Sequence, residues 1–403
     1  MYSLDMTKRV TVIGGGIAGP ITAMALAKAG METVVYEAHG HGSDGVGAFL
    51  TLAENGLEAL RALDLHDAVR DLGMQTPRMR IVNGKGKPLA DFGMRGRTVR
   101  RADLYAALRD EAVRRGVTIE YGKRLVDADL TPQGVRAAFA DGSGAEGDLL
   151  VGADGLRSRT RTIIDPKAPR ARHIGLLNTG GYARGLRLPG PAGVANMVFG
   201  RRCFFGYFVH PGGDVWWFAN PPSRREPTPA ELAAVTSEQW RARLVDLFGN
   251  DRGPMLDVIA ATETIMPAWN TYDFPSVPTW HNDRMVIIGD AAHATSPSSG
   301  QGASMAVEDA VVLGKCLRDL PSPAAFAAFE RARRQRVERV VAQGKRNGTG
   351  KAPGPAGALL RDLMMPALMR MTAKRDLMGW MFDYRIDWDA PVGARSGGPR
   401  GYS

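Results

Sequence analysis

Residues 284–310, RMVIIGDAAHATSPSSGQGASMAVEDA, combine a carboxylate with a glycine-rich loop. Asp290 follows an apolar run, Met285 to Ile288, that has the length and β-branched content of a buried strand. A carboxylate at the tip of a strand suits the hydroxyl groups of a polyol. The loop that follows contains Pro297 and Gly300 to Gly302, and glycines at a helix start let backbone N–H groups approach an electron-rich ring closely. Because a helix N-terminus carries about half a positive charge, it would favour negative charge developing on that ring.

A second glycine-rich stretch, GGGIAG at residues 14–19, lies between a predicted strand at 8–13 and a predicted helix. The next predicted strand, 33–36, ends at Glu37, so the glycines have the strand–loop–helix context that GxGxxG requires. They permit a tight turn and the approach of a pyrophosphate to the helix N-terminus, while Glu37 can accept hydrogen bonds from both ribose hydroxyls. This motif alone would fit NAD as well as FAD, and residues 289–302 favour FAD.

A third candidate site follows a predicted strand at 148–152. It contains Asp154, Gly155, Ser158 and Arg161, at the arginine-rich start of a helix. Guanidinium groups in such a position suit the phosphates of a dinucleotide.

The three stretches resemble, in order, the FAD motifs of the group A flavoprotein monooxygenases, the para-hydroxybenzoate hydroxylase-like family. The resemblance extends from residue 8 to about 348. It implies that Asp290 holds the ribityl chain and that the 297–302 loop lies against the isoalloxazine. It also implies that the motif at Asp154 binds both FAD and the passing nicotinamide cofactor. The positions that match cofactor contacts of the family are Gly14, Gly16, Ile17, Ala18, Gly19, Glu37, Ala38, Gly47, Ala48, Arg101, Val126, Asp154, Gly155, Gly289, Asp290, Pro297, Gly300, Gln301 and Gly302.

Several of these positions rest on the resemblance alone. Gly47 and Ala48 lie in a glycine-rich segment that passes near the flavin in the family. Arg101 opens a predicted helix and matches a residue that contacts the FAD phosphate or ribityl region, with Arg100 as the less favoured alternative. Val126 falls where family members contact the adenine through the backbone.

The resemblance also implies a reaction. NADPH or NADH, bound transiently, reduces a tightly but non-covalently bound FAD, and O2 adds at the flavin C4a. The hydroperoxide then hydroxylates or epoxidises an electron-rich substrate, which we expect to be an apolar, aromatic or polycyclic small molecule. Two alternatives stay open: a flavin-dependent reductase or dehydrogenase on the same fold, and a non-catalytic flavin-binding protein. The sequence names no general base, and we interpret His293 as structural because it has no paired acid in the sequence pattern.

The expected fold class is α/β, with a Rossmann-like FAD-binding domain interleaved with an antiparallel-sheet substrate domain, plus C-terminal helices. Both domains are expected to be discontinuous. The FAD-binding domain is assigned residues 1–76, 98–170 and 281–347, the substrate domain 77–97 and 171–280, and the C-terminal helical segment 348–390. The tail 391–403 is rich in Gly, Pro and Ser and is expected to be disordered. The Met-rich stretch 358–381 is open to interpretation as a packing element or as a substrate lid.

The substrate pocket is predicted from an aromatic hairpin, CFFGYFV and VWWF, around Gly212. If Tyr207 pairs with Trp217, alternation puts Phe205, Tyr207 and Trp217 on one face and Phe204, Phe208, Trp216 and Phe218 on the other. Two apolar faces indicate that one packs on the domain and the other lines a cavity, although helices such as 237–248 could cover both. Our working assignment for the pocket is Phe205, Tyr207 and Trp217.

Composition and charge limit the classes of binding partner that we expect. A net charge of +10 and a pI near 9.8 invite a nucleic-acid interpretation, but the arginines are spread along the whole chain, so we expect no nucleic acid and a surface that attracts an anionic nicotinamide cofactor. No apolar run reaches the roughly eighteen residues of a membrane span, and no targeting segment is evident. The two cysteines fit no metal or redox spacing and favour a reducing cytoplasm. The oligomeric state is left open between monomer and homodimer.

Overall fold

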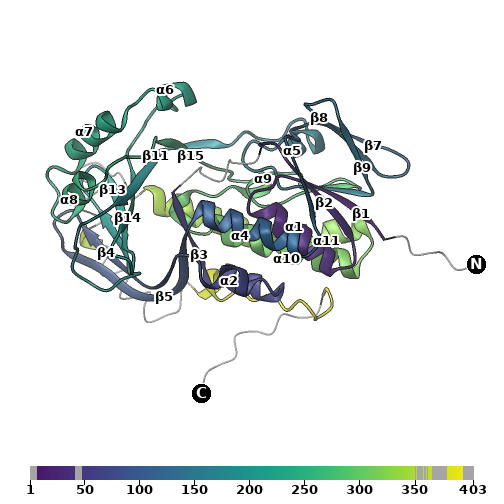
Figure 1. Ribbon diagram of the computed structural model, residues 1–403, viewed down its shortest axis with the longest axis horizontal. Helices are drawn as coiled ribbons and strands as arrows, with labels where there is room; N and C mark the ends of the chain where they lie inside the picture. Colours follow the sequence, from purple (N-terminus) through teal and green to yellow (C-terminus); the bar gives the residue numbers. More distant parts are fainter. Residues whose placement is uncertain are drawn as a thin grey trace, which may run out of the picture.

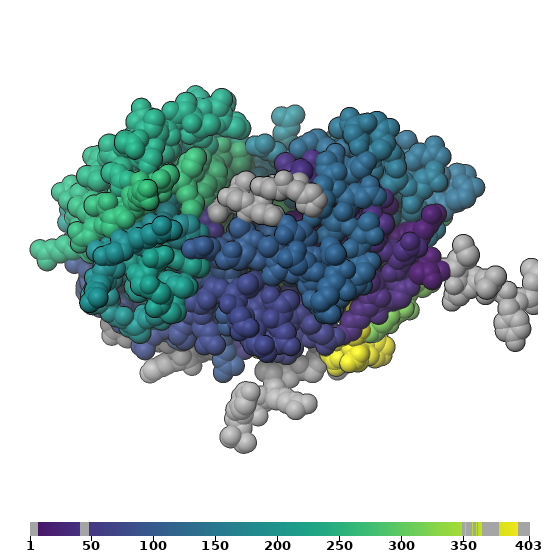
Figure 2. Space-filling view, viewed as in Figure 1, coloured from purple at the N-terminus to yellow at the C-terminus, as the bar shows by residue number. Residues whose placement is uncertain are grey.

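The computed structural model describes residues 7–40, 48–349, 351, 357, 360, 362–364 and 379–393. Figure 1 shows two parts side by side, a parallel sheet with its helices and a curved second sheet. Figure 2 shows the surface in the same view, with the teal and green residues that follow about residue 170 gathered on the left. None of the helices in the described part of the chain combines the length and apolar character needed to cross a bilayer.

The first part is built on a parallel sheet with the strand order β16-β10-β1-β2-β6 in the described chain. Its strands are β1 (Arg9–Ile13), β2 (Glu32–Glu37), β6 (Thr118–Tyr121), β10 (Leu149–Gly152) and β16 (Met285–Ile287). Such a sheet is covered on both faces, which explains the nearly continuous apolar runs in these segments. The chain order reverses between β1 and β10, and ligands of such sheets bind at the carboxyl ends of the strands beside that reversal.

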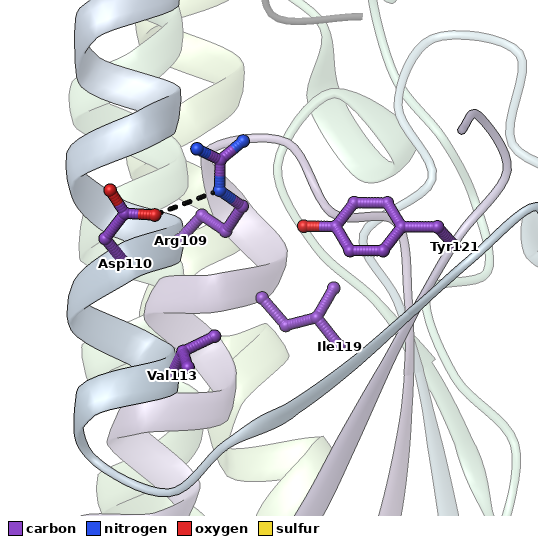
Figure 3. Close-up of a pocket in the computed structure, with 5 residues that line it drawn as sticks. All are labelled: Arg109, Asp110, Val113, Ile119 and Tyr121. Carbon is purple, nitrogen blue, oxygen red and sulfur yellow. Dashed lines mark hydrogen bonds and ion pairs between the residues drawn. The ribbon is translucent and has the colours of Figure 1, made fainter. Parts of the chain in front are cut away.

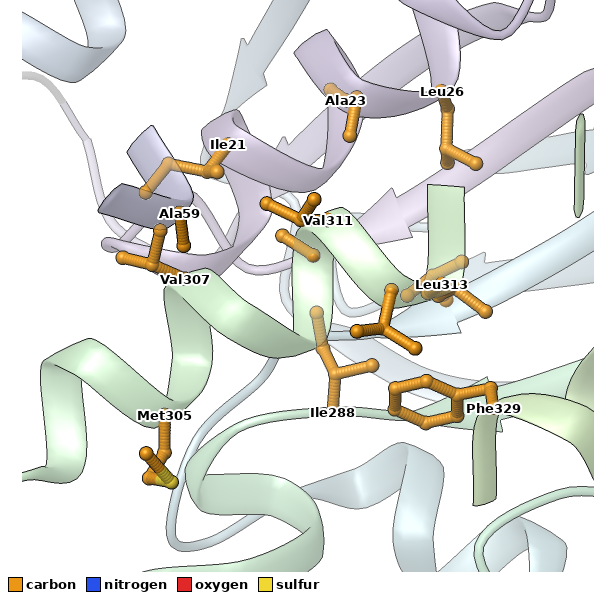
Figure 4. Close-up of a cluster of buried hydrophobic side chains, with 14 of the residues drawn as sticks. Ile21, Ala23, Leu26, Ala59, Ile288, Met305, Val307, Val311, Leu313 and Phe329 are labelled. Atoms are coloured by element: carbon orange, nitrogen blue, oxygen red, sulfur yellow. The ribbon is translucent and has the colours of Figure 1, made fainter. Parts of the chain in front are cut away.

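Helix α10 (Gly302–Asp319) is the central helix of this part. It lies between α1 (Ala18–Lys28) and α11 (Ser322–Thr349), and it is buried along most of its length. Figure 4 shows Val311 of α10 facing the apolar side chains of α1, with Phe329 of α11 on the other side. Because α10 is buried on nearly all sides, it is a core helix rather than a surface helix.

The other helices of this part are shorter. They are α2 (Glu54–Ala62), α3 (His66–Arg70), α4 (Arg101–Arg114), α5 (Arg159–Ile164), α9 (Asp290–His293) and α13 (Gly379–Phe382). A small antiparallel sheet of β7 (Leu125–Leu130), β8 (Val135–Phe139) and β9 (Gly144–Gly147) packs beside them. The first two strands form an antiparallel pair. The third has the sequence GAEG, which carries no β-branched or aromatic residue, and so it gave no strand signal.

The second part is a larger sheet with the order β15-β11-β14-β13-β12-β4-β5-β3 among the described residues. Its strands are β3 (Phe49–Ala53), β4 (Met74–Asn83), β5 (Pro88–Arg100), β11 (Arg172–Ala183), β12 (Ala195–Phe199), β13 (Phe204–Val209), β14 (Val215–Asn220) and β15 (Trp269–Asp273). The hairpin has the expected register, with Tyr207 opposite Trp217. The expectation of an antiparallel sheet is wrong at one pair, because β12 and β4 run parallel.

The second sheet also extends past the segments assigned to it. Strand β4 begins at Met74 and β5 ends at Arg100, and β3 joins the sheet by pairing with β5. The end of β3 is tied to the first part, since the Ala53 N–H donates to Ser304 Oγ at 3.1 Å. Strand β3 therefore belongs to both parts, and the division of the chain into domains stays a prediction.

Three helices cover one face of the second sheet: α6 (Pro229–Ala233), α7 (Ser237–Phe248) and α8 (Met255–Ala260). Helix α7 begins at the expected residue, because Thr236 and Gln239 form a capping box there. The opposite face of the sheet is turned toward the first part (Figure 1). Most of the predicted Met-rich helix at 358–381 and the tail beyond residue 393 lie outside the described residues.

Candidate cofactor and substrate site

Four strand ends meet at the carboxyl edge of the parallel sheet. Strand β1 runs into Gly14, β2 ends at Glu37, β10 is followed by Asp154, and β16 by Gly289. These strands are neighbours in register, so the structure brings the three motifs of the sequence to one place. Gly47 lies outside the described residues.

The glycine loop is shaped by contacts that leave no room for side chains. Gly14 has φ +107°, and a Cβ there would lie 2.4 Å from the Ala153 carbonyl oxygen. A Cβ on Gly19 would lie 1.8 Å from the Gly14 oxygen. At Gly16 a Cβ would meet only the Tyr105 hydroxyl, at 3.9 Å, so the loop opens onto free space. Because α1 begins with neither a side-chain cap nor an acidic residue, its N-terminal N–H groups fit a pyrophosphate.

Glu37 orients the glycine loop. Its Oε2 accepts a hydrogen bond of 2.6 Å from the Gly15 N–H, and its Oε1 accepts one of 2.8 Å from the His39 N–H. A carboxylate has about four acceptor positions, so capacity remains for hydroxyl groups of a ribose. Its contact with the cofactor stays a prediction.

Asp290 begins α9 and faces the start of α10. Its side chain is exposed, and its Oδ1 lies 4.0 Å from the position that a Cβ of Gly302 would take. Helix α10 also begins with neither a side-chain cap nor an acidic residue in its first turn. Before it, Pro297–Ser299 form a 3-10 turn and Gly300 has φ +63°. An exposed carboxylate beside an uncapped helix N-terminus fits the polyol and ring of FAD.

Helix α4 turns a polar stripe toward the glycine loop. Arg101, Tyr105 and Arg109 are spaced four residues apart and so lie on one face, and Arg101 Nε donates to the Tyr105 hydroxyl at 2.7 Å. Figure 3 shows a hollow of about 480 Å³ at the end of this stripe, with the Tyr121 hydroxyl pointing toward α4. The hollow is lined by Arg109, Asp110, Val113, Ile119 and Tyr121. Since Tyr121 pairs with Glu37, the hollow adjoins the predicted ribose end of the site.

The Asp154 motif is held together by its own hydrogen bonds. Asp154 accepts from Ser158 Oγ at 2.6 Å and from the Thr160 N–H at 2.9 Å. Arg161 is buried, donates to the carbonyls of Ala291 and Leu156, and has its pKa lowered by burial. Arg161 therefore ties this motif to α9 and does not face a dinucleotide phosphate. The exposed arginines nearby are Arg157 and Arg159, of which Arg159 Nε donates to the Val126 carbonyl at 2.7 Å.

The sequence interpretation of His293 as a histidine without an acid partner is wrong. Its Nε2 lies 2.5 Å from Asp309 Oδ2, which also accepts a 2.9 Å hydrogen bond from the Gly289 N–H. Arg333 Nε donates to the other Asp309 oxygen at 2.7 Å. Burial alone would raise the pKa of Asp309, but the charges of His293 and Arg333 lower it to about 2. A pair sixteen residues apart on two helices gives no local sequence signal.

These residues belong to a larger buried network beneath the cofactor loop. Arg333 and Arg336 both donate to Glu308, and Asn55 Nδ2 donates to Glu308 at 2.7 Å and to Gln301 Oε1 at 2.9 Å. Gln301 is fully buried, and its Nε2 has no partner in the described structure. The network thus connects the 297–302 loop to the residues around Asp290. Its role is to position both.

The assignment of Phe205, Tyr207 and Trp217 to the substrate pocket stays a prediction, and the packing of Phe205 and Trp217 argues against it. Phe205 and Trp217 are fully buried and stack at 5.2 Å, and Phe205 also contacts Phe248 of α7 at 5.4 Å. Trp217 Nε1 donates to Thr262 Oγ1 at 2.8 Å. This face belongs to the core beneath α7 and α8, because those helices supply the apolar cover that the alternation alone could not place.

The opposite face carries an aromatic box, which we define as Phe49, Tyr182, Phe208, Trp216 and Phe218. The Phe49 ring contacts the other four at centroid distances of 5.6 to 6.4 Å. The Tyr182 hydroxyl donates to the Ala48 carbonyl at 3.1 Å, which anchors the box to the segment before β3. Sequence reasoning missed Phe49 and Tyr182, since nothing local indicates that their strands join the hairpin.

A family model described as FAD binding domain matches residues 7–344 of this chain. The chain belongs to this family. It is 30% identical over 415 residues to a 3-amino-4-hydroxybenzoate 2-monooxygenase of Streptomyces platensis, and the match covers 96% of this chain and 98% of the relative. An FAD-dependent urate hydroxylase of Mycolicibacterium vanbaalenii is 28% identical over 366 residues, covering 84% and 87%. The crystal structure of Klebsiella pneumoniae HpxO complexed with FAD and uric acid has a TM-score of 0.80 at 25% identity, covering 93% and 97%.

These matches confirm the predicted family, fold class and cofactor. The chain is an FAD-dependent flavoprotein monooxygenase of the hydroxylase type, in a class that typically uses NAD(P)H as its reductant. In this flavoprotein the residues at the carboxyl edge fit FAD, with an open glycine loop, two uncapped helix N-termini and a free-standing carboxylate. No group of three metal-ligating side chains occurs among the residues that the structure describes.

Proposed function

We propose that this flavoprotein hydroxylates an aromatic small molecule held against the aromatic box. The supporting observation is the position of β3. Phe49 at its start belongs to the box, and Ala53 at its end is hydrogen-bonded to Ser304 at the start of α10. One short strand therefore forms a common wall between the box and the loop that would lie against the isoalloxazine.

FAD, when bound and reduced by NAD(P)H, supplies the activation of O2 that this hydroxylation needs. The chain supplies position and electrostatics. Residues 14–19, Glu37 and Asp290 would hold the cofactor, and the N-terminus of α10 would stabilise negative charge on the ring by about 1 kcal/mol, up to ~2 when partly buried. The aromatic side chains of the box would exclude water from the substrate. His293 is engaged by Asp309 and is assigned no role as a base.

The relatives support an aromatic substrate class, since their names specify 3-amino-4-hydroxybenzoate, urate, 3-hydroxybenzoate and 6-hydroxynicotinate. They also favour a monooxygenase over a reductase or a non-catalytic flavin protein. The site of oxygenation, and the choice between NADH and NADPH, are left to experiment.

The test is anaerobic reduction of the bound flavin by NADPH and by NADH, with and without aromatic candidates. We expect an aromatic substrate to accelerate bleaching of the visible flavin band, and 18O from labelled O2 to enter the product. Reduction that delivers no labelled oxygen to any product would instead identify a reductase. A protein with no flavin band that added FAD cannot restore would contradict the proposed site.

We also propose that the protein works in the cytoplasm as a monomer or homodimer. Cys203 and Cys316 are both buried and unpaired, which agrees with a reducing compartment. Light scattering during size-exclusion chromatography decides between the two oligomeric states.

A further inference from the structure

The aromatic box is bordered by a lysine whose charge has no acidic partner among the residues that the structure describes. Lys351 is only 5% exposed. Its Nζ donates to Asn220 Oδ1 at 2.6 Å and lies 4.0 Å from the Phe204 ring centre and 5.7 Å from that of Phe218. The Asn220 amide nitrogen is turned away, toward the oxygens of Leu177 and Asn178, which leaves the amide oxygen facing the lysine.

One hydrogen bond does not satisfy a buried ammonium group. It carries three N–H donors, and burying a charge is costly unless it is paired. Burial lowers the pKa of Lys351 to about 7, as expected where desolvation is not balanced by a carboxylate. Ring faces contribute some attraction for a cation but accept no strong hydrogen bond. An anion entering the box would supply the missing partner.

A second cation lies over the box. Arg100, the last residue of β5, has its guanidinium 5.1 Å from the Tyr182 ring and 5.5 Å from the Trp216 ring. Its Nε is buried and has no partner within the described structure, and the same holds for Trp216 Nε1. Asp103 acts electrostatically on Tyr182, and it forms no ion pair with Arg100 among the described residues.

The unsatisfied groups of the box share one character. Lys351 Nζ, Arg100 Nε and Trp216 Nε1 are all donors, and two of them are cationic. Phe49 links them, since its ring contacts both Trp216, at 5.7 Å, and Phe218, at 6.1 Å. Buried donors without full partners in a native structure call for an acceptor, and the described residues supply none here. The complementary ligand is a flat ring that carries negative charge, such as an aromatic carboxylate.

We propose that Lys351 and Arg100 make this enzyme selective for an anionic aromatic substrate, by binding its charged group while the ring lies among the side chains of the box. The proposal rests on the proposed function and narrows it, because the sequence by itself predicts only an apolar substrate. Both residues act on substrate binding and orientation.

The test compares acids with their neutral amides. Isothermal titration calorimetry on the FAD-loaded enzyme measures binding of 3-hydroxybenzoate and 6-hydroxynicotinate and of the two matching carboxamides. We expect at least one acid to bind about tenfold or more tightly than its amide, the difference that a charge-assisted hydrogen bond provides. Lys351→Met and Arg100→Met should each remove most of that preference while retaining bound FAD.

Arg136→Met is the matched control. It also removes one positive charge, but Arg136 lies on β8 in an exposed ion pair with Glu146 and is far from the box in sequence and sheet. The control should keep the full preference for acids. If no acid binds better than its amide in the wild-type enzyme, or if both box variants keep the wild-type preference, the proposal is wrong.

The outcomes separate this proposal from the proposed function. Acid-selective binding that depends on Lys351 and Arg100, without labelled oxygen in any product, would retain the anion site and reject the hydroxylase assignment for these ligands. Labelled product from a neutral ring, with no preference for acids, would retain the hydroxylase and reject the anion site. Far-UV circular dichroism and FAD content show whether each variant has folded.

Discussion

Two buried, charged regions of this flavoprotein differ in whether their charges have partners of opposite sign. Beneath α10, the carboxylates of Glu308 and Asp309 are matched by Arg333 and Arg336, at distances of 2.5 to 2.8 Å. In the aromatic box, Lys351 and Arg100 have no carboxylate within the described residues, and their surroundings are ring faces. The carboxylates of the first region therefore have partners of opposite charge, whereas the cations of the second region do not.

The difference indicates that the first region positions elements of the fold, whereas the second region recognises a ligand. A buried ion pair with all its hydrogen bonds holds elements in one arrangement, and removing one partner leaves an uncompensated charge. The network beneath α10 joins the 297–302 loop, α9 and α11, so it orders the cofactor side. A buried cation without a partner destabilises the empty protein, and that cost is recovered only when a ligand brings the opposite charge.

The largest effect is expected from breaking the ion pairs beneath α10. Arg333→Met leaves Glu308 and Asp309 facing each other without their shared cation, so the free energy of unfolding should fall by about 3 to 5 kcal/mol. Urea denaturation of the FAD-loaded protein measures it. Arg136→Met, at an exposed pair, should cost about 1 kcal/mol or less. Similar losses in both variants would mean that the network contributes no more than a surface pair.

A second prediction tests which face of the second sheet meets the substrate. Trp217→Leu should lower the free energy of unfolding by about 2 kcal/mol or more, because it opens a cavity under α7 and α8 and leaves Thr262 without its indole donor. It should leave ligand binding unchanged. Trp216→Leu, one residue away on the other face, should weaken ligand binding instead. Calorimetry that shows the reverse pattern would restore the original assignment of the pocket.

The predicted cofactor site is tested at the exposed carboxylate of Asp290. Asp290→Ala should weaken FAD binding by about 10- to 100-fold, the contribution of a charge-assisted hydrogen bond, while the fold is retained. The measurement is the dissociation constant of FAD from fluorescence quenching in the apoprotein, with circular dichroism as the control. Wild-type affinity in the variant would show that Asp290 does not contact the cofactor.

The smallest effect is expected at Lys351, and it is a gain in stability. Lys351→Met should raise the free energy of unfolding by about 1 kcal/mol at pH 7 in the absence of ligand, because it removes a buried, unpaired cation. The folded-state pKa of Lys351 is lowered to about 7, below the ordinary value of about 10.4 in the unfolded chain. The unfolded state therefore binds more protons between these values, and wild-type stability rises with pH there.

Raising the pH from 7 to 10 should accordingly stabilise the wild type relative to Lys351→Met, so that the advantage of the variant at pH 7 disappears and then reverses. Unfolding curves of both proteins over this range give the difference directly, and groups common to both cancel. A variant that is less stable than the wild type at pH 7, with no change in the difference up to pH 10, would place Lys351 among the satisfied charges.

Much of the cofactor side could be predicted from the sequence because its signals are local. The strands before Gly14, Asp154 and Gly289 are short apolar runs, and each is followed at once by its loop and helix. Backbone groups at helix starts are predicted to bind the cofactor, so the motif and the predicted site coincide. The alternation in the hairpin likewise predicted the register of Tyr207 with Trp217.

The substrate side could not be predicted in the same way. Alternation separates the two faces of the hairpin but contains no information on which face the helices α7 and α8 cover, so it could not decide which face meets the substrate. The sequence around His293 does not indicate Asp309 as its partner, because the two residues meet only when α9 packs on α10.

The sequence by itself determined the family, the parallel sheet and the loops that meet at the carboxyl edge of that sheet, because each of these depends on neighbours within one strand–loop–helix unit. Only the tertiary structure decided that Phe49, Tyr182 and the hairpin form one box, and that Lys351 and Arg100 border it. These residues come from five separate segments, and the charge balance between them exists only once the chain has brought them together.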